Sequence, residues 1–183
     1  MAPSVLVILA QGFEEVEAIV PIDLLRRSGA KVTVAGLGNR MVQGSHALVV
    51  QADALLSDCM QKTYDCVVLP GGSKGAENLA SSFEVLEMVI KCAQKGVVAA
   101  ICAATAVVLG KTGLLDGKQV TGYPGTEAVC PGLILQPKKV VVDHNLITGQ
   151  GPGAAMDFSL GIISTLFDAT TADKIAQQII YQR

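Results

Sequence analysis

Charged side chains are scarce in this sequence, and neither sign predominates. Of the 183 residues, 14 are Lys or Arg and 16 are Asp or Glu, which gives a formal net charge of −2. Nucleic-acid-binding proteins carry a clustered excess of basic residues, so this class of function is disfavoured. Hydrophobic residues make up 50% of the chain, which excludes a disordered protein and is enough for one domain spanning residues 1–183.

Histidines and paired cysteines are also few. The two histidines, His46 and His144, lie far apart in the sequence, and the five cysteines form no C-x-x-C pair. This pattern predicts neither a zinc site nor a disulfide framework. No phosphate-binding glycine pattern follows the first apolar run, which disfavours a flavin or nucleotide site. We therefore expect no metal and no cofactor.

No apolar run is long enough to cross a membrane. The longest, Gly96–Leu109, is bounded by Lys95 and Lys111 and is shorter than the ~20 residues that a membrane-spanning helix needs. The apolar segment Ser4–Ala10 has no Lys or Arg before it, so it does not have the form of a secretory signal. These features predict a cytoplasmic protein without a membrane partner.

Short β-branched runs alternate with helical patterns along the chain. Continuous apolar runs are typical of parallel strands that are covered on both faces, and the alternation predicts a three-layer α/β/α sandwich with a mostly parallel sheet. The turn Asp143–Asn145 predicts a hairpin at the sheet edge. The expected strands are Val5–Leu9, Val32–Ala35, Cys66–Leu69, Val97–Ile101 and Val140–Val142, and the expected helices are Glu15–Arg27, Phe83–Lys95, Ala103–Leu109, Ala154–Leu166 and Ala172–Tyr181.

A cysteine directly follows one of these strands. In α/β sheets, ligands bind beyond the carboxyl ends of the strands, and Cys102 lies between Val97–Ile101 and the next helix. Flanking alanines give the spacing of a nucleophile elbow, in which a strained turn projects the nucleophile into the crevice. The start of a helix also favours the thiolate, so we expect a lowered pKa for this thiol. The alternative is an inert buried cysteine, which suits Cys59, Cys66 and Cys92 better.

Glu17 is the acid expected to face this thiol. At about 100° per residue, Val16, Ile19 and Val20 form the apolar stripe of their helix, and Glu17 lies at its edge. A half-buried carboxyl beside a thiolate has a raised pKa and, when protonated, can donate a hydrogen bond to sulfur. The alternative is that Glu17 is a solvated glutamate at the rim of the site.

The other acids of this helix are assigned structural roles. Glu14 and Glu15 point further from the stripe and are favourable negative charges at the helix N-terminus. Asp23 is expected to form an ion pair with Arg26 or Arg27 on the helix surface.

Two glycine-rich turns could supply backbone donors. Pro70-Gly71-Gly72 follows a buried strand, and glycines there let N–H groups approach an oxyanion. The segment Gly149–Gly153 either borders the same site or only shapes a loop. A cysteine peptidase needs a base beside the thiol, and neither histidine lies at a strand end that faces Cys102.

These motifs together resemble the ThiJ/PfpI superfamily, in the branch of the Parkinson-disease protein deglycase and bacterial YajL. The resemblance covers nearly the whole chain and depends on three motifs, which are Gly12-x-Glu14-Glu15-x-Glu17, Leu69-Pro70-Gly71-Gly72 and Ala99-Ala100-Ile101-Cys102-Ala103. It implies a flavodoxin-like fold, a homodimer, Cys102 as an oxidisable nucleophile and Glu17 as its protonated partner. The backbones of Gly71, Gly72 and Ala103 would line an anion pocket, with His46, Tyr123 and Arg27 as further residues in the pocket or contributed by the dimer partner.

Three functions remain in competition at this point. The first is a cofactor-independent thiol enzyme of the glyoxalase or deglycase type, which acts on methylglyoxal, glyoxal or their early adducts. The second is a redox-sensing, oxidation-regulated chaperone, because an accessible reactive thiol oxidises readily. The third and weakest is a cysteine peptidase or amidase.

Overall fold

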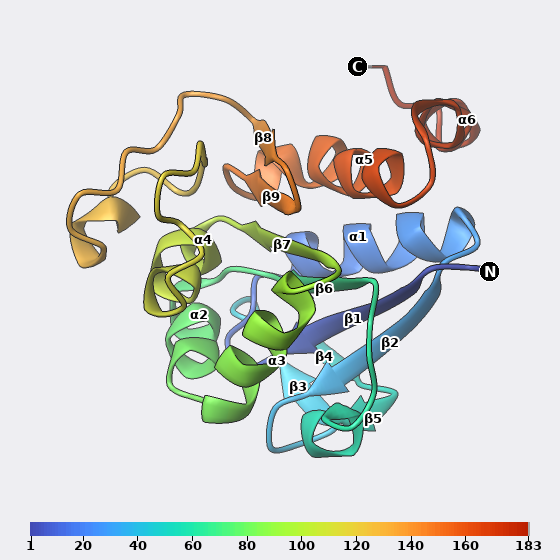
Figure 1. The fold of residues 1–183 in the computed structure, drawn as a ribbon. Coiled ribbons are helices and arrows are strands. Elements are labelled where there is room, and N and C mark those ends of the chain that lie inside the picture. The colour runs from blue at the N-terminus through green and yellow to red at the C-terminus, as the bar shows by residue number, and fades with distance from the viewer. Residues whose placement is uncertain (183) are drawn as a thin grey trace.

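A seven-stranded sheet forms the centre of the computed structural model, which describes residues 1–182 (Figure 1). The strand order is β5-β2-β1-β6-β7-β9-β8. Neighbouring strands are parallel, except that β8 runs antiparallel to β9. The strands are β1 (Ser4–Leu9), β2 (Lys31–Gly36), β5 (Ala54–Leu55), β6 (Cys66–Leu69), β7 (Val97–Ile101), β8 (Val140–Asp143) and β9 (Leu146–Gly149).

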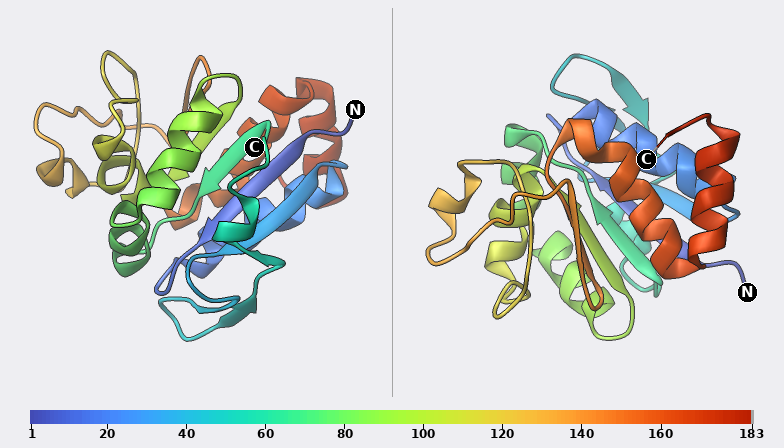
Figure 2. Two further views of the ribbon diagram at one scale, coloured as in Figure 1. Left: turned by 60° about the horizontal axis from the view of Figure 1, so that its bottom comes forward. Right: turned by 90° about the horizontal axis from the view of Figure 1, so that it is seen from above.

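Helices cover both faces of this sheet (Figures 1 and 2). On one face lie α1 (Glu15–Arg27), α5 (Ala155–Leu166) and α6 (Ala169–Gln178), and on the other lie α2 (Ser73–Ala80), α3 (Phe83–Ala93) and α4 (Ala103–Val107). Because both faces are covered, every residue of β6 and β7 is buried, as continuous apolar strands require. The expected three-layer α/β sandwich is confirmed.

All five expected strands are present, and the structure adds short elements that the apolar pattern does not reveal. A separate hairpin consists of β3 (Met41–Gln43) and β4 (Val49–Gln51). The expected hairpin at the sheet edge joins β8 to β9, and His144 adopts a φ of 56° in its turn. Helix α6 begins three residues earlier than expected, at Ala169.

The topology brings the carboxyl ends of β1, β6 and β7 together at the centre of one edge of the sheet. Strand β1 has β2 on one side and β6 on the other, so the direction of winding reverses there, and ligands bind at such reversals. The residues that follow β1, β6 and β7 all lie at this edge.

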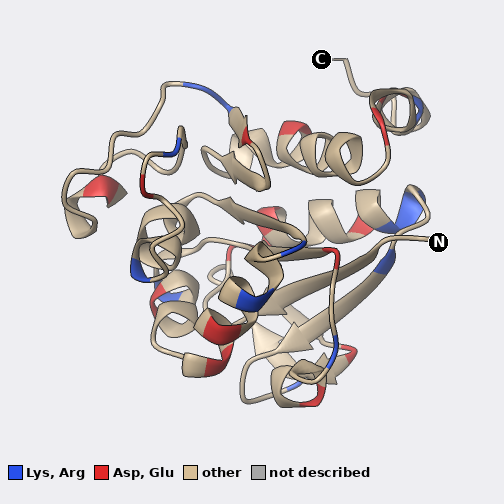
Figure 3. Cartoon of the chain, in the orientation of Figure 1, with Lys and Arg blue, Asp and Glu red and all other residues tan. Residues whose placement is uncertain are grey.

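Charges are spread over the described residues rather than collected on one element (Figure 3). The charged residues of α1 complement its helix dipole, with acidic residues in the first turn and arginines in the last. Within residues 1–182, no helix combines the length and the apolar character that a membrane span requires.

Candidate active site

A strained cysteine occupies the turn between β7 and α4. Cys102 has φ 63° and ψ −131°, and such angles cost a non-glycine residue about 1–3 kcal/mol. Its N–H donates to the carbonyl oxygen of Gly149 at 2.9 Å, and its own carbonyl oxygen accepts from the N–H of Tyr123 at 3.3 Å. Only 7% of the residue is exposed. The expected elbow is therefore present, with a thiol that is nearly enclosed.

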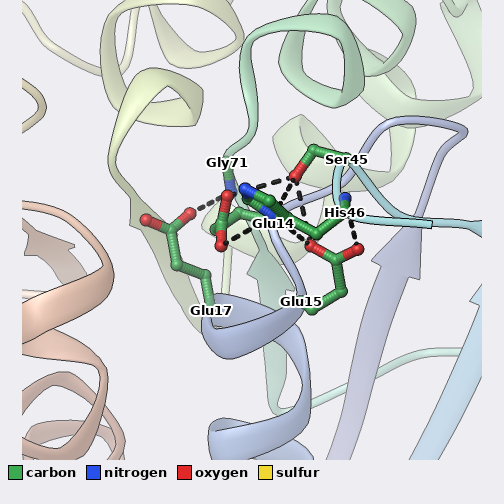
Figure 4. A network of polar contacts seen from close by, with 6 residues as sticks. All are labelled: Glu14, Glu15, Glu17, Ser45, His46 and Gly71. Atoms are coloured by element: carbon green, nitrogen blue, oxygen red, sulfur yellow. Dashed lines mark hydrogen bonds and ion pairs between the residues drawn. The ribbon is translucent and has the colours of Figure 1, made fainter. Parts of the chain in front are cut away.

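Glu17 is completely buried near the beginning of α1. Its Oε2 accepts a hydrogen bond from the N–H of Gly71 at 2.8 Å (Figure 4), while its Oε1 has no hydrogen-bond partner among the described residues. Burial raises the pKa of Glu17 to about 7, although hydrogen bonds with Cys102 and Gly71 act in the opposite direction. The expected raised pKa of this carboxyl is confirmed.

The buried face of α1 differs from the expected one. Val16 is 45% exposed and Ile19 is also exposed, whereas Glu15 is only 8% exposed. The predicted apolar stripe was therefore wrong, and Glu17 is completely buried where a half-buried carboxyl was expected. The reason is that residues 44–46 enclose the carboxylate of Glu15, and a different set of apolar side chains at helical spacing packs inward. The side chains that pack inward are Ala18, Pro21, Ile22, Leu24 and Leu25.

Gly71 lies beside both the carboxyl of Glu17 and the side chain of Cys102. A Cβ at this position would be 2.6 Å from Oε2 of Glu17 and 2.7 Å from Cβ of Cys102. Any side chain would separate the two groups, so their close approach requires glycine. Gly72 has a φ of 84°, and a Cβ there would collide with the carbonyl oxygen of Gly12.

Backbone donors surround the sulfur atom, as an anion pocket requires. Hydrogen bonds from the N–H groups of Ala103 and Gly72 stabilise the thiolate of Cys102 and so act to lower its pKa. The N–H of Gly71 is already donated to Glu17. Gly71 therefore contributes space to the pocket, whereas Gly72 and Ala103 direct donors at the sulfur.

The pKa of the Cys102 thiol differs from the prediction. Burial and the negative charge of Glu17 raise the pKa of Cys102 to about 12, so the predicted lowering by the helix dipole was wrong. Helix α4 has only five residues, and its dipole is too weak to offset burial. The repulsion from Glu17 acts only while that carboxyl is ionised.

The two groups therefore titrate as a pair. After the pair has lost one proton, the remaining proton can lie on the sulfur of Cys102 or on the carboxyl of Glu17. The second arrangement contains the thiolate, with a protonated carboxyl beside it. A nucleophile and an acid are thus available together in one charge state.

Arg27 is not in the pocket of its own chain. Its Nε forms an ion pair with Oδ2 of Asp23 at 2.7 Å, which confirms the ion pair expected on this helix. Arg27 follows Glu17 by ten residues, a distance of about 15 Å along the helix axis. Arg27 therefore does not belong to the pocket of its own chain, and its contribution to a dimer partner stays a prediction.

The other two expected residues lie nearer the site. The side chain of His46 is 73% exposed and contacts Glu15, with 3.0 Å between Nδ1 and Oε2. Tyr123 borders the elbow through its backbone, and a Cβ at Gly151 would lie 3.4 Å from the Tyr123 ring. The segment Gly149–Gly153 therefore borders the site, as one of the two alternatives predicted.

One group of side chains has metal-ligand spacing among the described residues. The ligand atoms of Glu14, Glu15 and His46 lie within 4.8 Å of one another. Their ligand atoms already form hydrogen bonds with each other and with the hydroxyl of Ser45. This network around Glu15 escaped sequence analysis because no periodic pattern brings residues 44–46 to α1.

Comparison with known families decides the classification. Residues 3–165 match the model of the DJ-1/PfpI family. The chain belongs to this family. This DJ-1/PfpI chain is 42% identical over 170 residues to Protein DJ-1 homolog B of Arabidopsis thaliana, a match that covers 90% of the chain but only 38% of that relative. The chain thus spans well under half of the length of that plant protein.

Two further DJ-1/PfpI relatives match nearly end to end. The glutathione-independent glyoxalase DJR-1.2 of Caenorhabditis elegans is 32% identical over 157 residues, which cover 84% of this chain and 82% of the relative. The solved structure of oxidized Toxoplasma gondii DJ-1 is 39% identical, has a TM-score of 0.95 and covers 100% of both chains.

Proposed function

We propose that this protein is a cofactor-independent glyoxalase or deglycase that converts reactive dicarbonyls, or their early adducts, into 2-hydroxy acids. The observation that carries the proposal is the close approach of Cys102 and Glu17 beside Gly71. Membership of the DJ-1/PfpI family supports it, because one relative is a glutathione-independent glyoxalase. The proposed site of action is the cytoplasm, where thiols stay reduced.

The first stage of the proposed mechanism forms a covalent adduct. The thiolate of Cys102 attacks the aldehyde carbon of methylglyoxal, a carbon–sulfur bond forms, and the carbonyl electron pair moves to oxygen. The N–H groups of Gly72 and Ala103, which already face the sulfur, stabilise the developing oxyanion. Glu17 then gives its proton to that oxygen, and the product is a hemithioacetal.

The second stage is an internal oxidation and reduction. The carboxylate of Glu17 removes the proton from the carbon bonded to sulfur, and a proton is returned to the adjacent carbon. The former aldehyde carbon is now oxidised to a thioester, and the former ketone is reduced to an alcohol. Water cleaves the thioester, which releases lactate and restores the thiol. Electrons balance within the substrate, so no external oxidant or cofactor is needed.

A peptidase mechanism has less support. It requires a histidine beside the thiol, and the imidazole of His46 pairs with Glu15 while His144 lies in the β8–β9 turn. Neither histidine is in hydrogen-bond contact with Cys102 among the contacts of the described residues.

The test is an assay of the purified protein with methylglyoxal and without glutathione. We expect one lactate to form for each methylglyoxal consumed, since the rearrangement is internal. Loss of methylglyoxal without lactate would indicate mere adduct formation on side chains and would contradict the proposal. Preincubating methylglyoxal with N-acetylcysteine separates the two activities: a glyoxalase follows the remaining free aldehyde, whereas a deglycase also consumes the adduct directly.

A redox-sensing role, with the chaperone activity that oxidation would regulate, is the second candidate. The unpartnered Oε1 of Glu17 favours it, because a protonated carboxyl could hold an oxidised sulfur through a hydrogen bond. The structure of the Toxoplasma gondii relative is of an oxidized protein. After mild peroxide treatment, mass spectrometry should find one or two oxygen atoms on Cys102 before any appear on Cys130, the most exposed of the other four cysteines. Uniform oxidation of the cysteines would argue against a sensor.

We further propose that two copies of the chain associate through the first turns of α1 and the β3–β4 hairpin. Val16 and Ile19 on the helix, and Leu48 and Val49 on the hairpin, are exposed apolar side chains, and the contact between Glu15 and His46 joins these two elements. Light scattering should give twice the chain mass of 19.0 kDa. Ile19→Asp should shift the protein toward the monomer, whereas Ile90→Asp, an exposed position on α3, should not.

A further inference from the structure

The loop of residues 44–46 surrounds the carboxylate of Glu15. Its Oε1 accepts from the N–H of His46 at 2.6 Å, and its Oε2 contacts Nδ1 of His46 at 3.0 Å and accepts from the hydroxyl of Ser45 at 3.1 Å (Figure 4). A Cβ at Gly44 would collide with this carboxylate. Residues 44–46 therefore wrap closely around one buried negative charge.

Contacts with neighbouring loops fix the beginning of α1, because its N-cap residue, Glu14, makes no side-chain capping bond. The N–H of Glu14 donates to the carbonyl of Gly71 at 3.0 Å, and the N–H of Ser45 donates to the carbonyl of Phe13 at 2.8 Å. One loop of the candidate site and the loop around Glu15 thus both hold the residues that lead directly into the first turn of α1. Glu17 belongs to this turn, and its position depends on both loops.

Glu15 and Glu17 have different surroundings although they are two residues apart. The carboxyl of Glu17 extends toward Gly71, whereas that of Glu15 extends toward His46 and Ser45 (Figure 4). Burial alone would raise the pKa of Glu15, but hydrogen bonds from the His46 side chain, from backbone N–H groups and from Ser45 lower it to about 2. Glu15 therefore stays ionised at a pH at which Glu17 is protonated, and its carboxylate remains hydrogen-bonded to residues 45 and 46.

We propose that Glu15, together with Ser45 and His46, positions the general acid Glu17 by fixing the first turn of α1 against residues 44–46. This inference rests on the proposed role of Glu17 in dicarbonyl conversion. Glu15 does not contact the reacting atoms and acts only through the helix. Removing its carboxylate leaves His46 N–H and the Ser45 hydroxyl without their acceptor and loosens one of the two attachments of the turn.

The test compares Glu15→Ala and Glu15→Gln with Asp23→Asn, which removes an exposed carboxylate from the same helix. The pH dependence of Cys102 alkylation by iodoacetamide is followed by mass spectrometry, because it reports the carboxyl–thiol pair without requiring turnover. Glu15→Ala should displace the alkylation midpoint by about half a pH unit or more and lower kcat by about tenfold, since small misplacements of a catalytic group are costly. Glu15→Gln keeps an acceptor and should show a smaller change, and Asp23→Asn none.

A purely structural role for Glu15 would lower the melting temperature of Glu15→Ala and leave the alkylation profile of the folded protein as in wild type, which would overturn the proposal. If Glu15→Ala does not fold, Ser45→Ala, which removes one donor, is measured in the same way. Imidazole NMR gives a second criterion. The hydrogen bond with Glu15 raises the pKa of His46 above 6.5, so an unshifted histidine in wild type would also contradict the proposal. Absence of lactate formation would reject the proposed function alone.

Discussion

Cys102→Ser is expected to abolish lactate formation from methylglyoxal. A hydroxyl is a far weaker nucleophile than a thiolate at neutral pH, and the neighbouring Glu17 cannot ionise it. We expect turnover to fall on the order of 1000-fold or more. The replacement is nearly isosteric, and the N–H groups of Gly72 and Ala103 remain in place, so substrate can still enter the site. The measurement is the initial rate of lactate release under saturating methylglyoxal.

Cys130→Ser is the matched control for this result. Cys130 is only partly buried and lies outside the candidate site, so its replacement should leave the rate unchanged. Cys102→Ala guards against an effect of the introduced hydroxyl and should be equally inactive. Lactate formation at the wild-type rate by either Cys102 variant would reject thiol catalysis.

Glu17→Gln should produce the second largest effect, on both turnover and the pH profile of the thiol. In wild type, loss of one proton from the pair gives access to the thiolate with protonated Glu17. The rate of Cys102 alkylation should therefore rise with pH. Its midpoint should lie near the pKa of Glu17, which burial raises to about 7. Glutamine cannot share a proton, so the buried thiol must ionise alone. The midpoint should move upward by about one pH unit or more, and kcat should fall about 100-fold or more because the acid and base is lost.

Loss of stability does not provide an alternative explanation for this variant. Ionising a carboxyl whose pKa is raised by burial costs free energy in the folded state, so wild type loses stability as the pH rises from 4.5 through about 7. Glutamine does not ionise, so it avoids this loss of stability. Glu17→Gln should therefore be at least as resistant to urea as wild type at pH 8. An unchanged alkylation midpoint in Glu17→Gln would mean that the carboxyl and thiol do not titrate together.

The layered fold was predictable because its main signals are local. Strands such as β6 and β7 are continuous apolar runs, which only a sheet covered on both faces accommodates. The elements that escaped prediction are short or weakly patterned. Strand β5 has two residues, and α2 has only eight, contains Gly75 and follows two glycines, so each is too short to stand out in the sequence.

The candidate site was predictable in its members and less so in its electrostatics. Cys102 follows from the end of β7 at which it lies, whereas Glu17 was chosen from an apolar stripe on α1 that the structure does not have, although Glu17 is buried. The high pKa of the thiol depends on burial and on the distance to a carboxyl, which no sequence pattern contains. The exposure of Val16 and the burial of Glu15 likewise depend on which loop covers the helix.

The supports of the strained Cys102 backbone have a consequence for the order in which the protein becomes reactive. Its N–H is bonded to Gly149 and its carbonyl to Tyr123, and both residues are synthesised after β7. A nascent chain that has not yet docked β9 would carry an ordinary, relaxed cysteine at the outer strand of an unfinished sheet. The strained elbow and its pairing with Glu17 are therefore assembled only when β9 has docked, late in the synthesis of the chain.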